Sequence, residues 1–239
     1  MSYDPVQQPI SARADARVVD AGLQAHMRGV YNTMCWGLFI TAATAYAVAN
    51  VEPLFNLVFH TAFRYVAIFA PLAFLWFGFT PRRVAGMDAG KLRGLFMLFS
   101  GLMGVSFASI FVAYSGVSIA RAFVVTSAMF AFMSLYGYTT KRDLSSMGSF
   151  MMMGMVGIFF AGILNIFLHS AAMYFVISAI GVVVFTGLTA WETQMIKENY
   201  AENAGRQANS KMATMGALNL YMSFINLFQF IINFTGQRN

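Results

Sequence analysis

Long apolar runs separated by short polar links make up most of this chain, and the pattern predicts membrane-spanning helices. Each run has roughly the 17–25 residues that a helix needs to cross the hydrocarbon core of a bilayer. The seven runs cover residues 29–50, 61–79, 94–114, 118–138, 148–168, 171–191 and 212–234. Links as short as Ser115–Gly116 and His169–Ser170 require neighbouring helices to pack as antiparallel hairpins. We therefore predict an all-α integral membrane protein built as a seven-transmembrane-helix bundle.

The first 27 residues are polar and lack the apolar core of a cleavable signal peptide. They predict a cytoplasmic tail in front of a first span that is kept as an anchor. From residue 28 to residue 239 no repeat or low-complexity tract interrupts the apolar runs. This part of the chain is predicted to be a single membrane domain.

Composition excludes an ordinary soluble protein. Hydrophobic residues account for 59% of the chain and charged residues for 10%, against about 25% charged residues in soluble domains. So few charges leave too little polar surface to solvate a globule. The single cysteine, Cys35, excludes an intramolecular disulfide and a metal site made of several cysteines.

The basic residues gather on one side of the predicted bundle. Most of the 15 Lys and Arg residues lie in the tail or in links that follow even-numbered runs: Arg13, Arg17, Arg28, Arg82, Arg83, Lys91, Arg93, Lys141, Arg142, Lys197, Arg206 and Lys211. By the positive-inside rule the N-terminus is then cytoplasmic and the C-terminus lies outside. The net charge of +6 is thus an orientation signal, and we expect no nucleic-acid partner.

Glu192 is an acidic residue that directly follows a long apolar run, residues 171–191. A charged side chain costs about 2.5–3.5 kcal/mol at a helix centre on insertion scales, and less toward the interface. An acid that is retained at such a position is by default a candidate functional residue. The charge distribution places Glu192 on the cytoplasmic side.

A polar stripe runs along the last predicted span. Asn219, Ser223, Asn226 and Asn233 recur at spacings of four, three and seven, which puts them within one narrow arc of a helix. Such a stripe either forms hydrogen bonds between helices or lines an ion path, and both alternatives stay open. Its cytoplasmic end lies at the depth of Glu192 and of Thr189, so these groups are predicted to converge.

Three segments resemble signatures of the Bax inhibitor-1 family. Residues 135–144 read LYGYTTKRDL, similar to the family's fourth span. Residues 189–197 read TAWETQMIK, similar to the end of its sixth span, and residues 219–228 read NLYMSFINLF, similar to its seventh span. The segments occur in the family's order, and the resemblance extends over nearly the whole chain.

This resemblance implies a seven-helix fold with the last helix central, in the inner membrane of a bacterium. It also implies a pH-sensitive calcium leak gated by two aspartates, one on each of the last two helices. At the matching positions this chain has Glu192, preceded by Trp191 where the family usually has tyrosine, and Ser223. The ion and pH-sensor site therefore carries a single acid.

The exchange of an acid for Ser223 changes what the site is expected to do. Two neighbouring carboxylates cannot both stay charged without a counter-ion, so such a pair binds a proton or a cation. A serine hydroxyl carries no charge, and one acid binds calcium weakly. We predict a calcium leak that is weak or poorly pH-gated, with Glu192 as a weak metal ligand and no cofactor other than calcium.

Two further hypotheses come from the cytoplasmic side. Arg82 or Arg83 is a candidate latch, because either lies on the side of Glu192 and offers it a salt bridge. The second hypothesis is a non-transporting regulator, since some bacterial members of the family resemble modulators of a membrane-anchored AAA protease. Residues 1–27 supply the cytoplasmic tail that this role needs.

The sequence does not favour an enzyme. His26, His60 and His169 lie at span ends, the first on one side of the membrane and the other two on the opposite side, so they form neither a triad nor a metal site. The last run, residues 212–234, contains no lysine for a retinal Schiff base. The expected partners are the lipid bilayer, calcium or other cations, and a membrane protein such as the protease.

Overall fold

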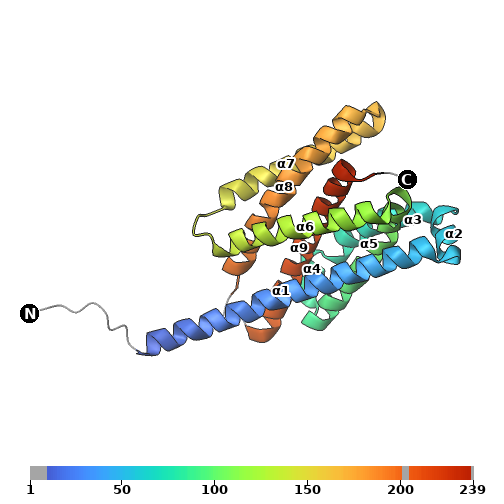
Figure 1. Ribbon diagram of the computed structural model, residues 1–239. Helices are drawn as coiled ribbons and strands as arrows, with labels where there is room; N and C mark the ends of the chain where they lie inside the picture. Colours follow the sequence, from blue (N-terminus) through green and yellow to red (C-terminus); the bar gives the residue numbers. More distant parts are fainter. Residues whose placement is uncertain (1–9, 201–204, 238–239) are drawn as a thin grey trace, which may run out of the picture.

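The computed structural model describes the backbone of residues 10–200 and 205–237, with side chains from residue 21 onward. This part of the chain forms nine helices (Figure 1): α1 (Ile10–Asn50), α2 (Glu52–Phe59), α3 (Phe63–Gly78), α4 (Pro81–Gly86), α5 (Ala89–Ala113), α6 (Gly116–Thr139), α7 (Ser145–Leu168), α8 (Ala171–Glu198) and α9 (Gly205–Thr235). Residues 1–9 of the predicted tail, Arg238 and the side chains of Arg13 and Arg17 lie outside the described parts.

The helix lengths support five or six membrane spans. Helices α5, α6, α7, α8 and α9 are each long and apolar enough to cross a bilayer, and α1 with α2 makes a sixth candidate that is bent by 93°. Helix α3 has 16 residues, about 24 Å at 1.5 Å per residue, which is short of a hydrocarbon core of about 30 Å. The all-α membrane fold is confirmed, and the count of seven spans and the orientation of the termini stay predictions.

The predicted boundary at residue 27 falls inside α1, because the helix already begins at Ile10. His26 and Met27 are buried against the bundle, and the rings of His26 and Tyr200 lie 5.2 Å apart. His26 and Met27, at the end of the predicted tail, therefore already pack on the bundle.

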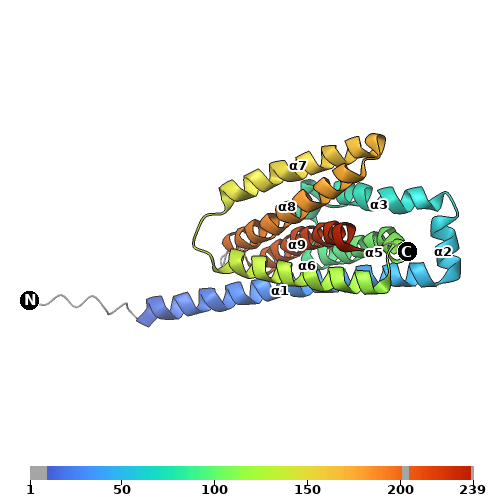
Figure 2. The same cartoon turned by 45° about the horizontal axis from the view of Figure 1, so that its top comes forward.

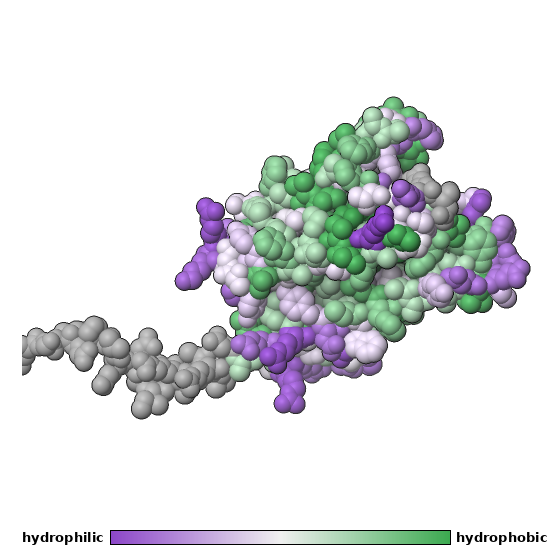
Figure 3. Space-filling model, viewed as in Figure 1, coloured by the Kyte–Doolittle hydropathy of each residue, from purple (hydrophilic) through white to green (hydrophobic). Residues whose placement is uncertain are grey.

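The exterior of the bundle is apolar and its interior contains hydroxyl groups. Large exposed side chains such as Trp76, Phe132 and Phe167 suit contact with lipid tails, and in Figure 3 hydrophobic residues cover most of the middle of the visible face. Buried polar residues are mainly Ser and Thr, and several donate to a carbonyl one turn back in their own helix, as Thr126 does to Ala122. This arrangement satisfies polar groups where no water is available.

Capping residues explain the short links. Ser115 and Ser170 each accept a hydrogen bond from a backbone N–H in the first turn of the following helix, α6 or α8. His169 adopts a left-handed conformation with φ of 49°, which ends α7 and reverses the chain within two residues. The predicted hairpins at both links are present.

Helix α9 lies at the centre of the bundle, the position expected for the last helix. It packs on α1, α5, α6 and α8, which surround it in Figure 2. Tyr221, Leu220 and Leu227 are fully buried along its length. The polar stripe of α9 therefore faces protein on several sides.

Gln194 joins the α6–α7 link to the end of α8. Its Oε1 accepts from the backbone N–H of Leu144 at 2.8 Å, and its Nε2 donates to the carbonyl of Arg142 at 2.8 Å. The side chain is buried. Both polar ends of the amide are thus used to hold the loop in place.

Replacing Gln194 by Leu is expected to lower the free energy of unfolding by about 2 kcal/mol, because the buried N–H of Leu144 and the part-buried carbonyl of Arg142 lose their partner. Thermal unfolding in detergent measures the effect. Gln229→Leu is the matched control, since Gln229 is exposed on α9. Equal melting temperatures for the two variants would contradict a stabilising role for the hydrogen bonds of Gln194.

Candidate functional site

The structure brings the carboxyl group of Glu192 of α8 within interacting distance of the Ser223 hydroxyl of α9. Ser223 is 2% exposed. The Oε2 atom of Glu192 is inaccessible to solvent and has no hydrogen-bond partner among the described residues. The site therefore consists of one acid, one hydroxyl and an acceptor position that protein groups leave unused.

Close packing of α8 against α9 sets this register. Near one end of the pair of helices, Gly181 faces the ring of Phe230, and a Cβ at this glycine would lie 2.6 Å from the ring. Near the other end, a Cβ at Gly216 would lie 3.0 Å from Ile196. Because these two glycines leave room for Phe230 and Ile196, the antiparallel helices lie close enough for Glu192 to contact α9.

The other residues of the predicted stripe do not join the pair. Thr189 is fully buried and donates to the carbonyl of Phe185 in its own helix. Asn226 likewise donates within α9, to Met222. Asn233 accepts from the Tyr114 hydroxyl at 3.0 Å near the far end of the bundle. The stripe is therefore used in separate contacts along α9.

Asn219 lies apart from these contacts, in a small pocket of about 210 Å³ between the ends of α8 and α9 and a face of α1. His26 and Asn199 also line this pocket. Two residues of its wall lie near the pair. Asn219 is one helical turn from Ser223, and Ile196 is one helical turn from Glu192. The pocket thus approaches the pair from the end that the charge distribution assigns to the cytoplasm.

Arg82 and Arg83 do not reach Glu192. Both are exposed on α4, and across residues 21–200 and 205–237 the ion pair observed is Lys91 with Asp88, at 3.5 Å. Helix α4 follows α3, which packs on α5. The structure thus offers no support for the arginine latch.

A different cation holds α4 to the bundle. The Nζ atom of Lys211 donates to the carbonyls of Val84 and Ala85, at 3.4 and 3.0 Å. A lysine at the carbonyl end of a helix also opposes the negative end of the helix dipole. Lys211 therefore anchors α4 by its backbone and leaves the arginines free to face solvent.

Two hydroxyl clusters were not predicted from the sequence. In the first, the Tyr221 hydroxyl bonds Thr41 at 2.7 Å, and Thr41 donates to the Ser100 carbonyl at 2.9 Å. In the second, Ser134 of α6 bonds Tyr31 of α1 at 2.6 Å and Thr193 of α8 at 3.0 Å. Each cluster joins three helices.

The sequence does contain a signal for the second cluster. Small or polar residues recur at positions 118, 122, 126, 134 and 137, all on the buried face of α6. Spacings of three, four and eight mark one helix face. The partners on α1 and α8, however, depend on packing that no local pattern specifies.

The residues present fit a resident calcium ion poorly. Calcium in proteins takes six to eight oxygen ligands, commonly from several carboxylates and carbonyls. The site supplies one carboxylate and one hydroxyl, and the described residues contain no group of three His, Cys, Asp or Glu placed to hold a metal. The site therefore does not supply the ligand set of a resident calcium ion.

A family model described as "Inhibitor of apoptosis-promoting Bax1" matches residues 23–239. The chain belongs to the Bax inhibitor-1 family. The resemblance of the three sequence segments is thereby confirmed over nearly the whole chain.

Relatives in several bacteria agree with this membership of the Bax inhibitor-1 family. Inner membrane protein YbhL of Escherichia coli is 42% identical over 91% of this chain and 94% of its own length. An uncharacterised protein of Caulobacter vibrioides is 43% identical over 94% of this chain and 92% of its own length. RP147 of Rickettsia prowazekii is 40% identical over 93% of each chain. With its apolar helices, this Bax inhibitor-1 family member is an integral inner-membrane protein.

Proposed function

We propose that this protein is a weak cation leak of the inner membrane in which Glu192 binds the passing ion. The observation that carries the proposal is the buried Oε2 atom of Glu192, which lacks a protein partner among the described residues. A buried polar atom without a hydrogen-bond partner costs free energy. An ion bound to Oε2 would offset that cost. Calcium and other hard cations prefer such an oxygen.

The pocket beside Asn219 is the proposed cytoplasmic entrance, because its wall ends one turn from the pair. Beyond Ser223, the same face of α9 continues with the buried residues Leu227 and Ile231. These apolar side chains close the path in this conformation. Conduction therefore requires α8 and α9 to move apart. This movement would follow the binding of an ion at Glu192.

The pH response is proposed to be shallow. A diacid site couples two charges, so a proton on one carboxyl changes the state of the other. Ser223 cannot take part in such coupling, because its hydroxyl stays neutral at physiological pH. A steep transition near neutral pH in liposomes would contradict this part of the proposal.

Glu192→Gln is expected to reduce calcium flux into dye-loaded liposomes about tenfold, the effect of losing about 1.4 kcal/mol of ion binding. The amide keeps the volume of the side chain and has an oxygen that can accept a hydrogen bond. Glu198→Gln, at the exposed end of the same helix, is the control and should leave the flux unchanged. An unaltered flux in Glu192→Gln would remove this residue from the path.

The regulatory role has one structural observation in its favour. Helix α1 has 41 residues, about 62 Å at 1.5 Å per residue, and its N-terminal part projects clear of the bundle in Figures 1 and 2. A projecting helix can bind a membrane-anchored protein such as an AAA protease. Deleting residues 1–20 separates the two roles, since a regulator would lose its partner in pull-down and a leak would keep its flux.

A further inference from the structure

A groove separates α1 from α6 on the surface of the bundle. Helix α1 packs mainly on α5 and α9, whereas α6 packs mainly on α8 and α9. Two cavities, of about 340 and 710 Å³, lie in the gap between α1 and α6. They share Leu38, Phe123 and Phe224, so they form one continuous depression, the α1–α6 groove. Both volumes lie in the range of small-molecule sites.

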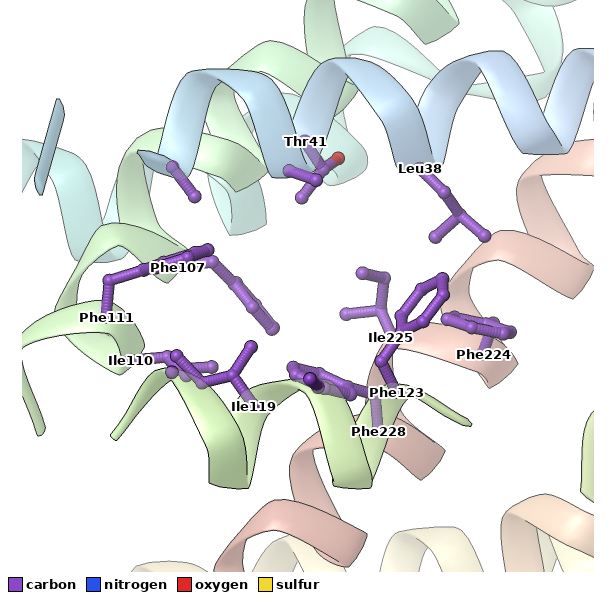
Figure 4. A pocket seen from close by; sticks show the side chains of 14 residues that line it. Leu38, Thr41, Phe107, Ile110, Phe111, Ile119, Phe123, Phe224, Ile225 and Phe228 are labelled. Carbon is purple, nitrogen blue, oxygen red and sulfur yellow. The ribbon is translucent and has the colours of Figure 1, made fainter. Parts of the chain in front are cut away.

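The smaller lobe of the α1–α6 groove is apolar. Figure 4 shows an open centre between Leu38 and Thr41 on one side and aromatic side chains such as Phe107, Phe123 and Phe228 on the other. Thr41 is the polar side chain in its wall, and its hydroxyl is already bonded to Tyr221 and to the Ser100 carbonyl. The lobe therefore offers an occupant dispersion contacts only, as an acyl chain requires.

The larger lobe ends in a polar mouth. Arg28, Gln24, Tyr31 and Tyr138 line it, and Arg28 is exposed without an acidic partner among the described residues. The Nζ atom of Lys197 lies 5.4 Å from the centre of the Tyr138 ring and adds a second positive charge behind the mouth. A guanidinium with phenolic hydroxyls beside it complements a phosphate group.

The spacing of these features matches a lipid. From Arg28 to Leu38 is ten residues of α1, about 15 Å along the helix, which is half of a hydrocarbon core of about 30 Å. A headgroup held by Arg28 at the interface would thus place its chain at the apolar lobe near the middle of the bilayer. Exposed wall residues such as Cys35, Ala42 and Ala131 open the groove to the surface, so a lipid can enter sideways.

We infer that the α1–α6 groove binds one phospholipid with a net negative headgroup, its phosphate on Arg28 and one acyl chain in the lobe beside Thr41. This site is separate from Glu192 and does not depend on the proposed leak. A bound lipid would fill a gap that α1 and α6 leave over α9, and it would hold α1 at a fixed distance from α6.

Cys35, the single cysteine of the chain, lines the groove and serves as a probe. The protein is placed in nanodiscs of phosphatidylcholine with or without phosphatidylglycerol, and alkylation of Cys35 by N-ethylmaleimide is timed. Phosphatidylglycerol is expected to slow alkylation about tenfold, the protection that about 1.4 kcal/mol of preferential binding provides. Arg28→Gln should abolish the protection, and Arg28→Lys should retain most of it.

Matched variants separate a bound lipid from the general lipid shell. Arg121→Gln removes an exposed arginine of α6 outside the groove and should keep the protection. Ala42→Phe fills the apolar lobe and should reduce it, whereas Ala43→Phe, an exposed neighbour outside the lobe, should not. Equal rates in both lipids, protection that survives Arg28→Gln, or protection by glycerol phosphate alone would each overturn the inference.

Discussion

Gly137→Ala is expected to destabilise the protein by about 1–3 kcal/mol and to lower its melting temperature by about 5 °C. Gly137 lies on α6 where that helix crosses α8, and an added Cβ would overlap the backbone carbonyl of Ala190. A backbone atom cannot move aside as a flexible side chain can, so the helices must separate. The loss exceeds the gain of about 1 kcal/mol that alanine normally brings to a helix interior.

The effect should extend to the candidate site. Ala190 lies two residues before Glu192. Ser134, one turn from Gly137, forms a hydrogen bond with Thr193. Separation of α6 from α8 would shift the carboxylate away from Ser223. Gly157→Ala is the matched control, since a Cβ at Gly157 of α7 meets no atom within 4 Å. Thermal unfolding in detergent and flux in liposomes measure both variants. Identical melting temperatures would show that α6 and α8 tolerate the added methyl group.

Ser223→Asp is expected to raise calcium flux about tenfold and to make it fall steeply with acidification. The substitution places a second carboxyl beside Glu192, at the position where the Ser223 hydroxyl now lies. Two adjacent carboxylates bind either a proton or a cation between them, so protons compete with calcium for the site. About 1.4 kcal/mol of added ion binding corresponds to the tenfold change.

Asn226→Asp is the control for the second acid. Asn226 is half-buried on α9, and its amide bonds the backbone of its own helix, so an acid there adds charge without forming a pair with Glu192. Flux measured across a range of pH values in liposomes compares the two variants. A pH profile of Ser223→Asp that equals that of the unaltered protein would rule out a coupled pair at this place.

The sequence predicted the parts of the fold that depend on local pattern. Long apolar runs identified the helices, and capping serines at 115 and 170 explain why two links needed only two residues. The structure departs from the predicted spans in the first third of the chain. Runs of similar hydropathy there correspond to a helix that bends after Asn50 and to the short α3, because hydropathy alone does not fix where a helix breaks.

The candidate site was predicted to the extent that depth and helix face determine it. Glu192 and Ser223 lie on neighbouring helices at one depth, and the structure places them in contact. The arginine hypothesis relied only on the side of the membrane that Arg82 and Arg83 share with Glu192. That information does not tell which atoms of α4 contact the bundle. Lys211 joins α4 to the bundle through backbone carbonyls, a contact that no spacing of charges along the chain indicates.

The shortness of α3 has a consequence for the surrounding bilayer. In the predicted seven-span arrangement, α3 would cross the bilayer as a helix of about 24 Å and leave about 6 Å of hydrocarbon thickness unmatched. Lipids accommodate such hydrophobic mismatch by thinning locally. In that arrangement the protein should deform thick membranes around α3 and have least strain in thin ones, so bilayer thickness would act on it as a mechanical variable.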